Sequence, residues 1–432
     1  MRILLLTTYF RPDFASTGVI MSTLADEFAA KGHEVTVLAS VPHYDVNRVW
    51  PEYSRKMIHF EQSDSMRIYR LYTYIAQDRA SVMQRIAAYG SFNLLSTFKG
   101  ITLHRHDVIL VPSPPLSNGV IADVLSRLRG TPFVYNVQDI WPDVAVRAGV
   151  LKNPRMIRRL RKMEDYVYRR AARIAVISEG FRTNLLSKGV PAEKISVIPN
   201  FIDTQHVVPQ TKHNPFSQRH GLEGKFVALF AGNMGFSQGL ETVLDAAKRL
   251  ESIKEIRFLL VGNGAGRERA EAYLKTLNIS NTRFLPFQPH ESLPDMYGAA
   301  DVCLIPLRRG FTKESVPCKL FSIMSSGKPA VAAVDRDSET RSLLEESGAG
   351  VWVEPENADA LADSILQYFR DPVACRIAGD NGRRCVEERF RSEIIAEKYL
   401  DLMRAATMGN VPTSMDNKKA DCPKTGSGVQ HE

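Results

Sequence analysis

Glu314-Ser-Val-Pro-Cys-Lys-Leu-Phe-Ser-Ile-Met-Ser-Ser-Gly-Lys-Pro-Ala330 is the stretch of this sequence that decides the fold. An apolar run, Asp301-Val-Cys-Leu-Ile-Pro306, precedes it, and a second apolar run, Pro329-Ala-Val-Ala-Ala333, follows it. The pattern predicts a buried strand, a loop, a short helix and another buried strand. In an open α/β sheet such a loop presents free backbone N–H groups at the carboxyl ends of the strands, where anionic ligands bind.

Two charged side chains make this stretch chemically informative. The Glu314 carboxylate and the Lys319 ammonium, five positions apart, can serve sugar hydroxyls and a phosphate from one small element. An ordinary strand-to-helix connection with a solvated acid and base explains the same residues. From this stretch alone both interpretations stay open.

The bulk properties indicate a globular protein of two domains. The chain has 432 residues, and this length exceeds what one hydrophobic core usually organises. Hydrophobic residues make up 44% of the chain and charged residues 24%. Its five cysteines are scattered without CxxC spacing, so reduced thiols and a cytoplasmic location are expected. The first residues, Met1-Arg-Ile-Leu-Leu-Leu-Thr7, read as a strand, and no run of about 18 apolar residues predicts a membrane span.

The net charge of +8 is concentrated in the first half of the chain, with +10 over residues 1–200 and −2 over the remainder. A basic first domain favours an anionic surface or substrate. Residues 154–171 predict a strongly basic helix, which is either a solvated face or a contact with an anionic membrane. Residues 80–103 predict a partly apolar helix, which lies either on a membrane surface or against the sheet.

Strand and helix patterns alternate through both halves, so the sequence predicts an α/β protein of two doubly wound parallel-sheet domains. The boundaries place an N-terminal domain at 1–203, a linker at 204–224 and a second domain at 225–390. A C-terminal helix at 391–407 is expected to pack back toward the first domain, and a polar tail at 408–432 is expected to be disordered.

Three glycine-containing turns at strand ends favour a phosphate-bearing ligand. They are Gly18, the loop Gly232-Asn-Met-Gly-Phe-Ser-Gln-Gly239 and the loop Gly262-Asn-Gly-Ala-Gly266. Each is weak alone, because glycines after strands are also common for packing. The run Gln138-Asp-Ile-Trp-Pro-Asp143 follows a strand directly, which is an active-site position in such sheets. The ten histidines are dispersed without metal-ligand spacing, so no metal is expected, and neither a GxGxxG nor a Walker loop occurs.

In this order the motifs resemble the retaining glycosyltransferases of family 4, which have the GT-B fold of two facing Rossmann-like domains with a central cleft. The resemblance covers about residues 1–400. It rests on Ser178 to Asp203, on the Gly232–Gly239 loop followed by Leu240-Glu241, and on Glu314 to Pro329. The Gln138–Asp143 run and the Gly232 loop are most similar to the bacterial subgroup that builds surface polysaccharides of the colanic-acid and O-antigen type.

The resemblance implies a role for each motif residue. Glu314 would hold donor-sugar hydroxyls, Lys319 would approach the donor diphosphate, and Asp139 would face the acceptor, the last on its strand-end position. The remaining donor-binding residues implied are Gly18, Gly232, Asn233, Leu285, Phe287, Ser315, Val316, Leu320 and Ser322. A UDP- or GDP-linked sugar is expected as substrate, with no cofactor and no nucleic acid.

Two departures from the family pattern change these expectations. The second glutamate of the motif, eight residues after the first and usually assigned to the ribose, is Ser322 here. The Arg and Lys that many members have in the glycine loop correspond to Asn233 and Gln238. Lys319 therefore carries more of the phosphate recognition than it would otherwise.

Three functional hypotheses follow from the sequence. The first is a metal-independent retaining glycosyltransferase, cytoplasmic and peripheral on the inner face of the plasma membrane, acting on a polysaccharide or lipid-linked acceptor. The second is a nucleotide-sugar epimerase or hydrolase with the same fold, which needs no polymeric acceptor. The third is a non-catalytic partner subunit, which the joint departures at Ser322, Asn233 and Gln238 favour.

Overall fold

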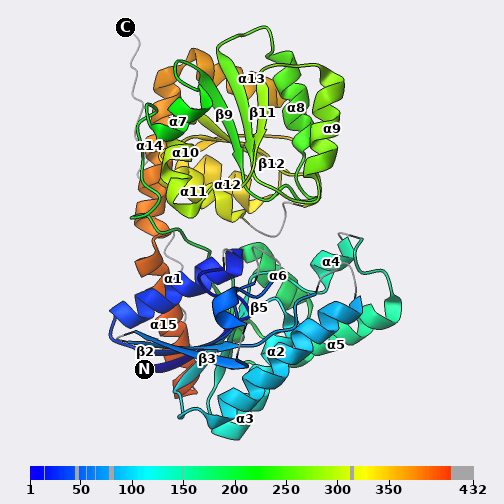
Figure 1. Ribbon diagram of the computed structural model, residues 1–432, viewed down its shortest axis with the longest axis vertical. Helices are drawn as coiled ribbons and strands as arrows, with labels where there is room; N and C mark the ends of the chain where they lie inside the picture. Colours follow the sequence, from blue (N-terminus) through cyan, green and yellow to red (C-terminus); the bar gives the residue numbers. More distant parts are fainter. Residues whose placement is uncertain are drawn as a thin grey trace. The chain divides into compact units, whose positions relative to one another are not determined.

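The computed structural model describes residues 1–13, 15–43, 48–54, 56–63, 65–76, 82–147, 149–311 and 316–409. The chain divides into two compact units (Figure 1). Among the described residues, the first comprises Met1–Thr204 and Arg389–Gly409, and the second comprises Gln205–Glu388. The boundary expected at residue 203 therefore lies one residue earlier than the boundary between the units.

The first unit contains an eight-stranded sheet in the order β3-β4-β2-β1-β5-β6-β7-β8. All neighbouring strands pair in parallel except β3, which pairs antiparallel with β4 at the edge. The strands are β1 (Arg2–Leu6), β2 (Glu34–Ser40), β3 (Ile58–Ser63), β4 (Met66–Leu71), β5 (Val108–Ser113), β6 (Phe133–Val137), β7 (Arg173–Val176) and β8 (Ile195–Val197).

Helices cover both faces of this sheet. They are α1 (Ser16–Ala30), α2 (Val82–Thr102), α3 (Leu116–Arg129), α4 (Asp143–Arg147), α5 (Pro154–Arg170), α6 (Glu179–Ser187) and α15 (Ser392–Met408), with short 3-10 turns η1 (Pro51–Tyr53) and η2 (Ala192–Lys194). Because side chains alternate along a strand, Ile3 and Leu5 of β1 pack with α1 and α15, whereas Leu4 and Leu6 pack with α2, α3, α5 and α6. The C-terminal helix expected at 391–407 corresponds to α15, which contacts α1 and strands β5 to β7.

The second unit contains a six-stranded, fully parallel sheet in the order β11-β10-β9-β12-β13-β14. The strands are β9 (Phe226–Ala231), β10 (Ile256–Val261), β11 (Thr282–Leu285), β12 (Val302–Pro306), β13 (Ala330–Ala333) and β14 (Gly350–Val353). The helices are α7 (Pro215–His220), α8 (Leu240–Arg249), α9 (Arg267–Leu277), α10 (Leu293–Gly298), α11 (Cys318–Ser325), α12 (Glu339–Ser347), α13 (Ala358–Arg370) and α14 (Pro372–Arg389), with the 3-10 turn η3 (His290–Ser292). Helices α8, α9 and α13 share one core with one face of the sheet.

Three segments differ from the sequence-based expectation. The segment 204–224, expected to be a linker, contains helix α7, whose Asn214 side chain forms a capping box with Ser217 and whose body packs on α10. Strand β3 lies within residues 40–66, for which the sequence predicts irregular structure, and β14 follows the strand at Pro329–Ala333, which is the last one that the sequence predicts. Most of the tail expected at 408–432 lies outside the described residues.

The order of strands places a switch point in each sheet, where neighbouring strands lead to connections on opposite sides. In the first sheet it lies between β1 and β5, and in the second between β9 and β12. Ligands of open α/β sheets bind at the carboxyl ends of the strands at such points. In the second unit these ends carry the Gly232–Gly239 loop and the residues from Leu307 onward.

Candidate functional site

The two glycine loops of the second unit pack backbone against backbone. The amide of Met234 donates to the Asn263 carbonyl and the amide of Gly266 donates to the Met234 carbonyl, both at 2.8 Å. A Cβ on Gly262, which has φ +145°, would lie 1.9 Å from the carbonyl oxygen of Gly232. The second glycine loop is therefore explained by close packing, which was one of the two interpretations from the sequence.

The Gly232 loop keeps backbone donors available at the edge of the sheet. Within the described part of the chain, the amides of Asn233, Gly235, Phe236 and Ser237 have no hydrogen-bond partner. Such a series of N–H groups after a strand is a common anion-binding arrangement. Gly232 itself has φ +136°, which favours glycine at the turn.

Lys319 reaches this loop from the first turn of α11. Its Nζ donates to Oε1 of Gln238 at 3.0 Å and lies 4.1 Å from the centre of the Phe230 ring. Its Cε and Nζ lie 3.4 Å from the position that a Cβ on Gly232 would take, so the glycine makes room for the lysine.

The ammonium of Lys319 is enclosed although the residue as a whole keeps partial exposure. Desolvation lowers its pKa to about 7, and no carboxylate among the described residues offsets this effect. An enclosed lysine that lacks an acidic partner, beside free backbone N–H groups, can bind an anionic ligand by charge-assisted hydrogen bonds.

The other motif residues of the 314–322 segment lie in different surroundings, and two of them are not described by the structure. Glu314 and Ser315 lie outside the described residues, and Val316 is half-buried just before α11. Leu320 is completely buried and its amide donates to the Pro317 carbonyl, so it contributes packing at this position.

Ser322, the position of the missing glutamate, is hydrogen-bonded to the hydroxyl of the buried Tyr297. Burial is the main cause that raises the pKa of Tyr297, which keeps its hydroxyl protonated as a partner. The Ser322 hydroxyl therefore already has a hydrogen-bond partner inside the second unit.

Leu285 and Phe287 lie at the carboxyl end of the edge strand β11. The Leu285 carbonyl accepts from the amide of Gly262 at 3.0 Å and from Nη1 of Arg267 at 3.2 Å. Phe287, two residues later, is 58% exposed. An exposed aromatic ring beside a fixed backbone suits a flat ligand such as a nucleobase.

Gly18 of the first unit lies in the first turn of α1, whose first amides have no side-chain cap. A Cβ at this position would approach the Tyr9 Cβ at 3.1 Å, so a larger residue requires the loop after β1 to move. The amide of Gly18 thus belongs to an uncapped helix N-terminus that the close packing of Tyr9 fixes in place.

Asp139 follows β6 in the first unit. The residue as a whole is exposed, while desolvation of its carboxyl group by the surrounding protein raises its pKa to about 6. A buried chain of hydrogen bonds supports the preceding residue: Gln138 Nε2 donates to Asn136 Oδ1 at 2.8 Å, and Asn136 Nδ2 donates to the Tyr399 hydroxyl of α15. Helix α15 thereby fixes the loop that carries Asp139.

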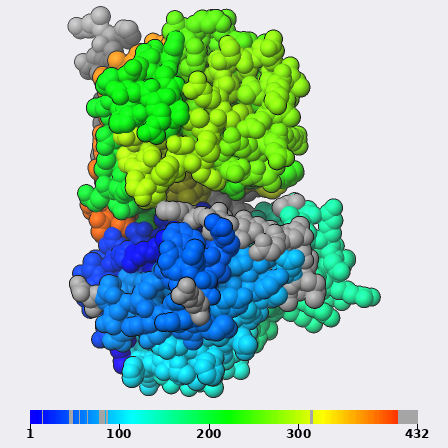
Figure 2. Space-filling view, viewed as in Figure 1, coloured from blue at the N-terminus to red at the C-terminus, as the bar shows by residue number. Residues whose placement is uncertain are grey.

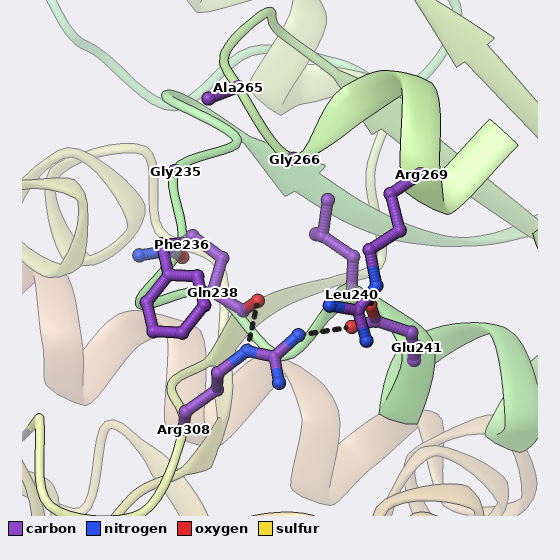
Figure 3. A pocket seen from close by; sticks show the side chains of 9 residues that line it. All are labelled: Gly235, Phe236, Gln238, Leu240, Glu241, Ala265, Gly266, Arg269 and Arg308. Atoms are coloured by element: carbon purple, nitrogen blue, oxygen red, sulfur yellow. Dashed lines mark hydrogen bonds and ion pairs between the residues drawn. The ribbon is translucent and has the colours of Figure 1, made fainter. Parts of the chain in front are cut away.

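A small pocket of the second unit was not anticipated from the sequence (Figure 3). Its volume is about 110 Å³, and it lies between the Gly232 loop and the N-terminal ends of α8 and α9. Glu241 is held from two sides, by Arg308 Nη2 at 2.8 Å and by Arg269 Nε at 2.9 Å. Glu241 was part of the motif that follows the Gly232 loop, but no local sequence signal pairs it with Arg269 or Arg308, because only the fold brings these residues together.

Three further observations concern metals, cysteines and membranes, and all are limited to the described residues. No group of three or more His, Cys, Asp or Glu side chains is arranged to hold a metal ion there. None of Cys303, Cys318, Cys375 and Cys385 forms a disulfide. No helix in the described ranges combines the length and apolar character that crossing a bilayer requires.

Two family models match the chain. The model described as "Glycosyl transferase 4-like domain" matches residues 17–200, and the model described as "Glycosyl transferases group 1" matches residues 213–385. Each model falls within one of the two structural units, and together they cover most of the chain.

Curated relatives and solved structures extend the comparison. The chain is similar to the putative colanic acid biosynthesis glycosyl transferase WcaI of Escherichia coli K12, with 28% identity over 90% of this chain and 97% of the relative. It is also similar to the probable glycosyltransferase WbjE of Pseudomonas aeruginosa, with 26% identity over 69% of this chain and 75% of the relative.

Among solved structures, sucrose-phosphate synthase from Thermosynechococcus elongatus matches with a TM-score of 0.72 and 20% identity, over 95% of this chain and all of that one. Anabaena Alr3699/HepE, in complex with UDP-glucose, matches with a TM-score of 0.70 and 17% identity, over 94% of this chain and all of that one. At these identities the likeness concerns the fold, which is the pair of parallel-sheet α/β domains.

Proposed function

This chain belongs to the glycosyltransferases, with a 4-like domain over residues 17–200 and a group 1 domain over residues 213–385, and we propose that it uses a nucleotide-sugar donor to extend a glycan in polysaccharide biosynthesis. The similarity to a putative colanic acid biosynthesis glycosyl transferase supports a role in polysaccharide biosynthesis, and we propose a polysaccharide or a lipid-linked oligosaccharide as the acceptor. The proposed reaction retains the configuration at the anomeric carbon and needs no metal ion.

The observation that carries this proposal is the enclosed ammonium of Lys319 beside the amides of the Gly232 loop. Its position 3.0 Å from Gln238 and 3.4 Å from the Cβ position of Gly232 puts one positive charge at the switch point of the second sheet. A diphosphate placed there receives the lysine and the loop amides together. The same contacts stabilise the negative charge that develops on the diphosphate as it leaves.

The remaining contacts are assigned by position. The amide of Gly18 would donate to the donor diphosphate, and Leu285 and Phe287 would contact the nucleobase through backbone and ring. Glu314, which lies outside the described residues, is proposed to hold the donor-sugar hydroxyls. Asp139 is proposed to face the acceptor. A diphosphate oxygen takes the proton of the attacking acceptor hydroxyl, so the proposed mechanism requires no side-chain base.

We place the acceptor at an anionic membrane surface on the basis of helices α2, α3 and α5. All seven basic residues of α5 are exposed, and four of them, Arg155, Arg158, Arg159 and Lys162, have no ion-pair partner among the described residues. The neighbouring α2 and α3 carry a stripe of exposed apolar side chains, Leu94, Phe98, Ile101, Val124 and Leu128. Helix α2 also packs on the sheet through its other face. In Figure 2, α2, α3 and α5 lie in the part of the surface that is coloured cyan to turquoise.

Turnover of a panel of UDP- and GDP-sugars with isolated cell-envelope glycolipids tests the proposal. Transfer should occur in the presence of a chelator, and NMR of the product should give the anomeric configuration of the donor. Glu314→Ala should lose most of the activity, and an unchanged rate would refute its role. Donor consumption without acceptor would instead favour the epimerase or hydrolase, and absence of donor binding would favour the non-catalytic subunit.

A separate measurement tests the membrane contact. Flotation with vesicles of phosphatidylglycerol should retain the protein at low salt and release it at high salt, because exposed charges are screened. Replacing the four unpaired cations of α5 by Gln should abolish flotation. Failure of the wild-type protein to float at low salt would refute the membrane contact and leave the transfer reaction untouched.

A further inference from the structure

We propose that the pocket between the Gly232 loop and the N-terminal ends of α8 and α9 binds an anionic sugar, with its carboxylate or phosphate on Arg269 and Arg308 and its ring on Phe236. The three side chains come from α9, from the segment after β12 and from the loop after β9. Figure 3 shows that they surround one hollow together with Glu241. The pocket lies wholly within the second unit.

The first argument concerns hydrogen-bond donors. Arg269 uses Nε for Glu241, while Arg308 uses Nη2 for Glu241 and Nε for the Gln238 carbonyl at 3.3 Å. Within the described residues, both Nη atoms of Arg269 and Nη1 of Arg308 have no hydrogen-bond or ion-pair partner. Two guanidinium groups against one carboxylate leave one net positive charge and three free nitrogen atoms. This set matches the planar oxygen pairs of a carboxylate or phosphate.

The second argument concerns size and shape. A volume of about 110 Å³ accommodates an anionic group but is well below that of pockets that enclose whole ligands, so the rest of the ligand lies at the rim. Phe236 lies at this rim with 61% of its surface exposed. Its ring meets the Phe311 ring edge-on, with 6.0 Å between the two ring centres. Aromatic rings offer the apolar face on which sugar rings pack.

The backbone adds to the positive character of the pocket. Helices α8 and α9, of 10 and 11 residues, begin at Leu240 and Arg267, and their N-cap residues, Gly239 and Gly266, provide no side-chain cap. Their first-turn amides and dipoles therefore favour negative charge in the same hollow. This contribution supports the arginines and would not define a site without them.

One residue, Gln238, contacts both this pocket and Lys319. The backbone carbonyl of Gln238 accepts from Arg308, and its side-chain oxygen accepts from Lys319. The binding proposed here is nevertheless independent of the proposed transfer reaction, because it is measured on the protein without donor or turnover. A failure of one would leave the other standing.

Calorimetric titration of the full chain with four probes tests the assignment. Glucose 6-phosphate or glucuronate should bind more tightly than inorganic phosphate, whereas glucose should not bind. Tighter binding of glucuronate would indicate an acidic residue of a glycan, and tighter binding of glucose 6-phosphate would indicate a free sugar phosphate. Equal binding of glucose and the anionic sugars would overturn the proposal.

Two substitutions should act in opposite directions. Arg269→Gln removes free donors and should weaken glucose 6-phosphate and glucuronate binding about three- to tenfold, as expected for a partly exposed charged contact. Glu241→Gln removes the competing carboxylate and should strengthen binding by a similar factor. Arg249→Gln is the control, because Arg249 is on α8 and pairs with Asp359 outside the pocket. Unchanged affinity in both test variants, or weaker binding in Glu241→Gln at full folding, would refute the site.

Discussion

Replacing Lys319 should change donor affinity in a way that depends on pH. Because desolvation lowers the pKa of this lysine to about 7, only part of the protein carries the charge at neutral pH. A bound diphosphate favours the charged form, so binding takes up a proton. Affinity of the wild-type protein should therefore fall as pH rises through 7.

The size of the effect follows from the titration. With a pKa of about 7, about nine-tenths of the lysine is charged at pH 6 and about one-tenth at pH 8, which predicts an approximately tenfold loss of affinity. Lys319→Met removes a charge-assisted hydrogen bond of about 1.5–3 kcal/mol, or about 10- to 150-fold in affinity where the wild-type lysine is charged. Near pH 8.5 the two proteins should differ much less, because most of the wild-type lysine is then neutral.

The assay is calorimetric titration of UDP- and GDP-sugars between pH 6 and pH 8.5. A nucleotide-sugar lacks the phosphate-monoester proton that titrates near pH 6, so the charge of its diphosphate is constant over this range. Lys319→Arg keeps the charge and should flatten the profile. Lys328→Met is the matched control. Lys328, which lies just before strand β13, also has a lowered pKa, but its ammonium donates a hydrogen bond to the Gly298 carbonyl.

Two results would refute this reasoning. One is a wild-type affinity that stays constant between pH 6 and pH 8. The other is a Lys319→Met variant that loses the same factor at both ends of the range, since that would mean that the lysine acts by shape and not by charge.

The remaining predictions concern packing and the first unit. Gly262→Ala should lower the free energy of unfolding by about 3 kcal/mol or more in thermal and denaturant melts, because the Cβ would lie 1.9 Å from a backbone oxygen; Gly32→Ala, with open space at φ +78°, should cost about 1 kcal/mol. Tyr399→Phe leaves the buried amide of Asn136 without its acceptor and should cost about 1–3 kcal/mol. Asp139→Asn should lower transfer activity, because the ionised carboxylate is proposed to face the acceptor, and it should remove the acid limb that the wild-type kcat/KM profile should have near pH 6, where the carboxylate protonates. A profile with the same limb in both proteins would contradict that assignment.

Most of the regular elements of the second unit were predictable because they have a strong local period, but α7 and β14 were not predicted. The sequence predicts a strand at Phe226–Ala231, which is the range of β9, and a helix at Leu240–Leu250, which is one residue longer than α8. Both were predictable because a short apolar run and a helical spacing are properties of neighbouring residues. Strand β3 was missed because it is an edge strand with exposed polar positions, and its pairing with β4 is set by the partner. Helix α7 was missed because it is only six residues long.

The candidate site was predictable to the same local extent. Lys319 was identified from a motif within one connection, and its contact with the Gly232 loop follows from both lying at carboxyl ends of adjacent strands. The cluster of Glu241 and Arg308 was missed because these residues are 67 positions apart and meet only through the order of β9 and β12. The low pKa of Lys319 was equally invisible, since it depends on the atoms that enclose the ammonium.

The departures from the family pattern have a common physical consequence. At Gln238, where many members have lysine, a second ammonium would lie about as close to Lys319 as the 3.0 Å of the present hydrogen bond, and like charges at that distance disfavour each other. The amide oxygen instead accepts a hydrogen bond from Lys319, which leaves the positive charge of the ammonium in place. At Ser322, where the family pattern has a glutamate, the hydroxyl is hydrogen-bonded to Tyr297. Lys319 is therefore the enclosed positive charge beside the Gly232 loop, so we expect the strength of the proposed anion binding at this loop to depend on the protonation of this one residue.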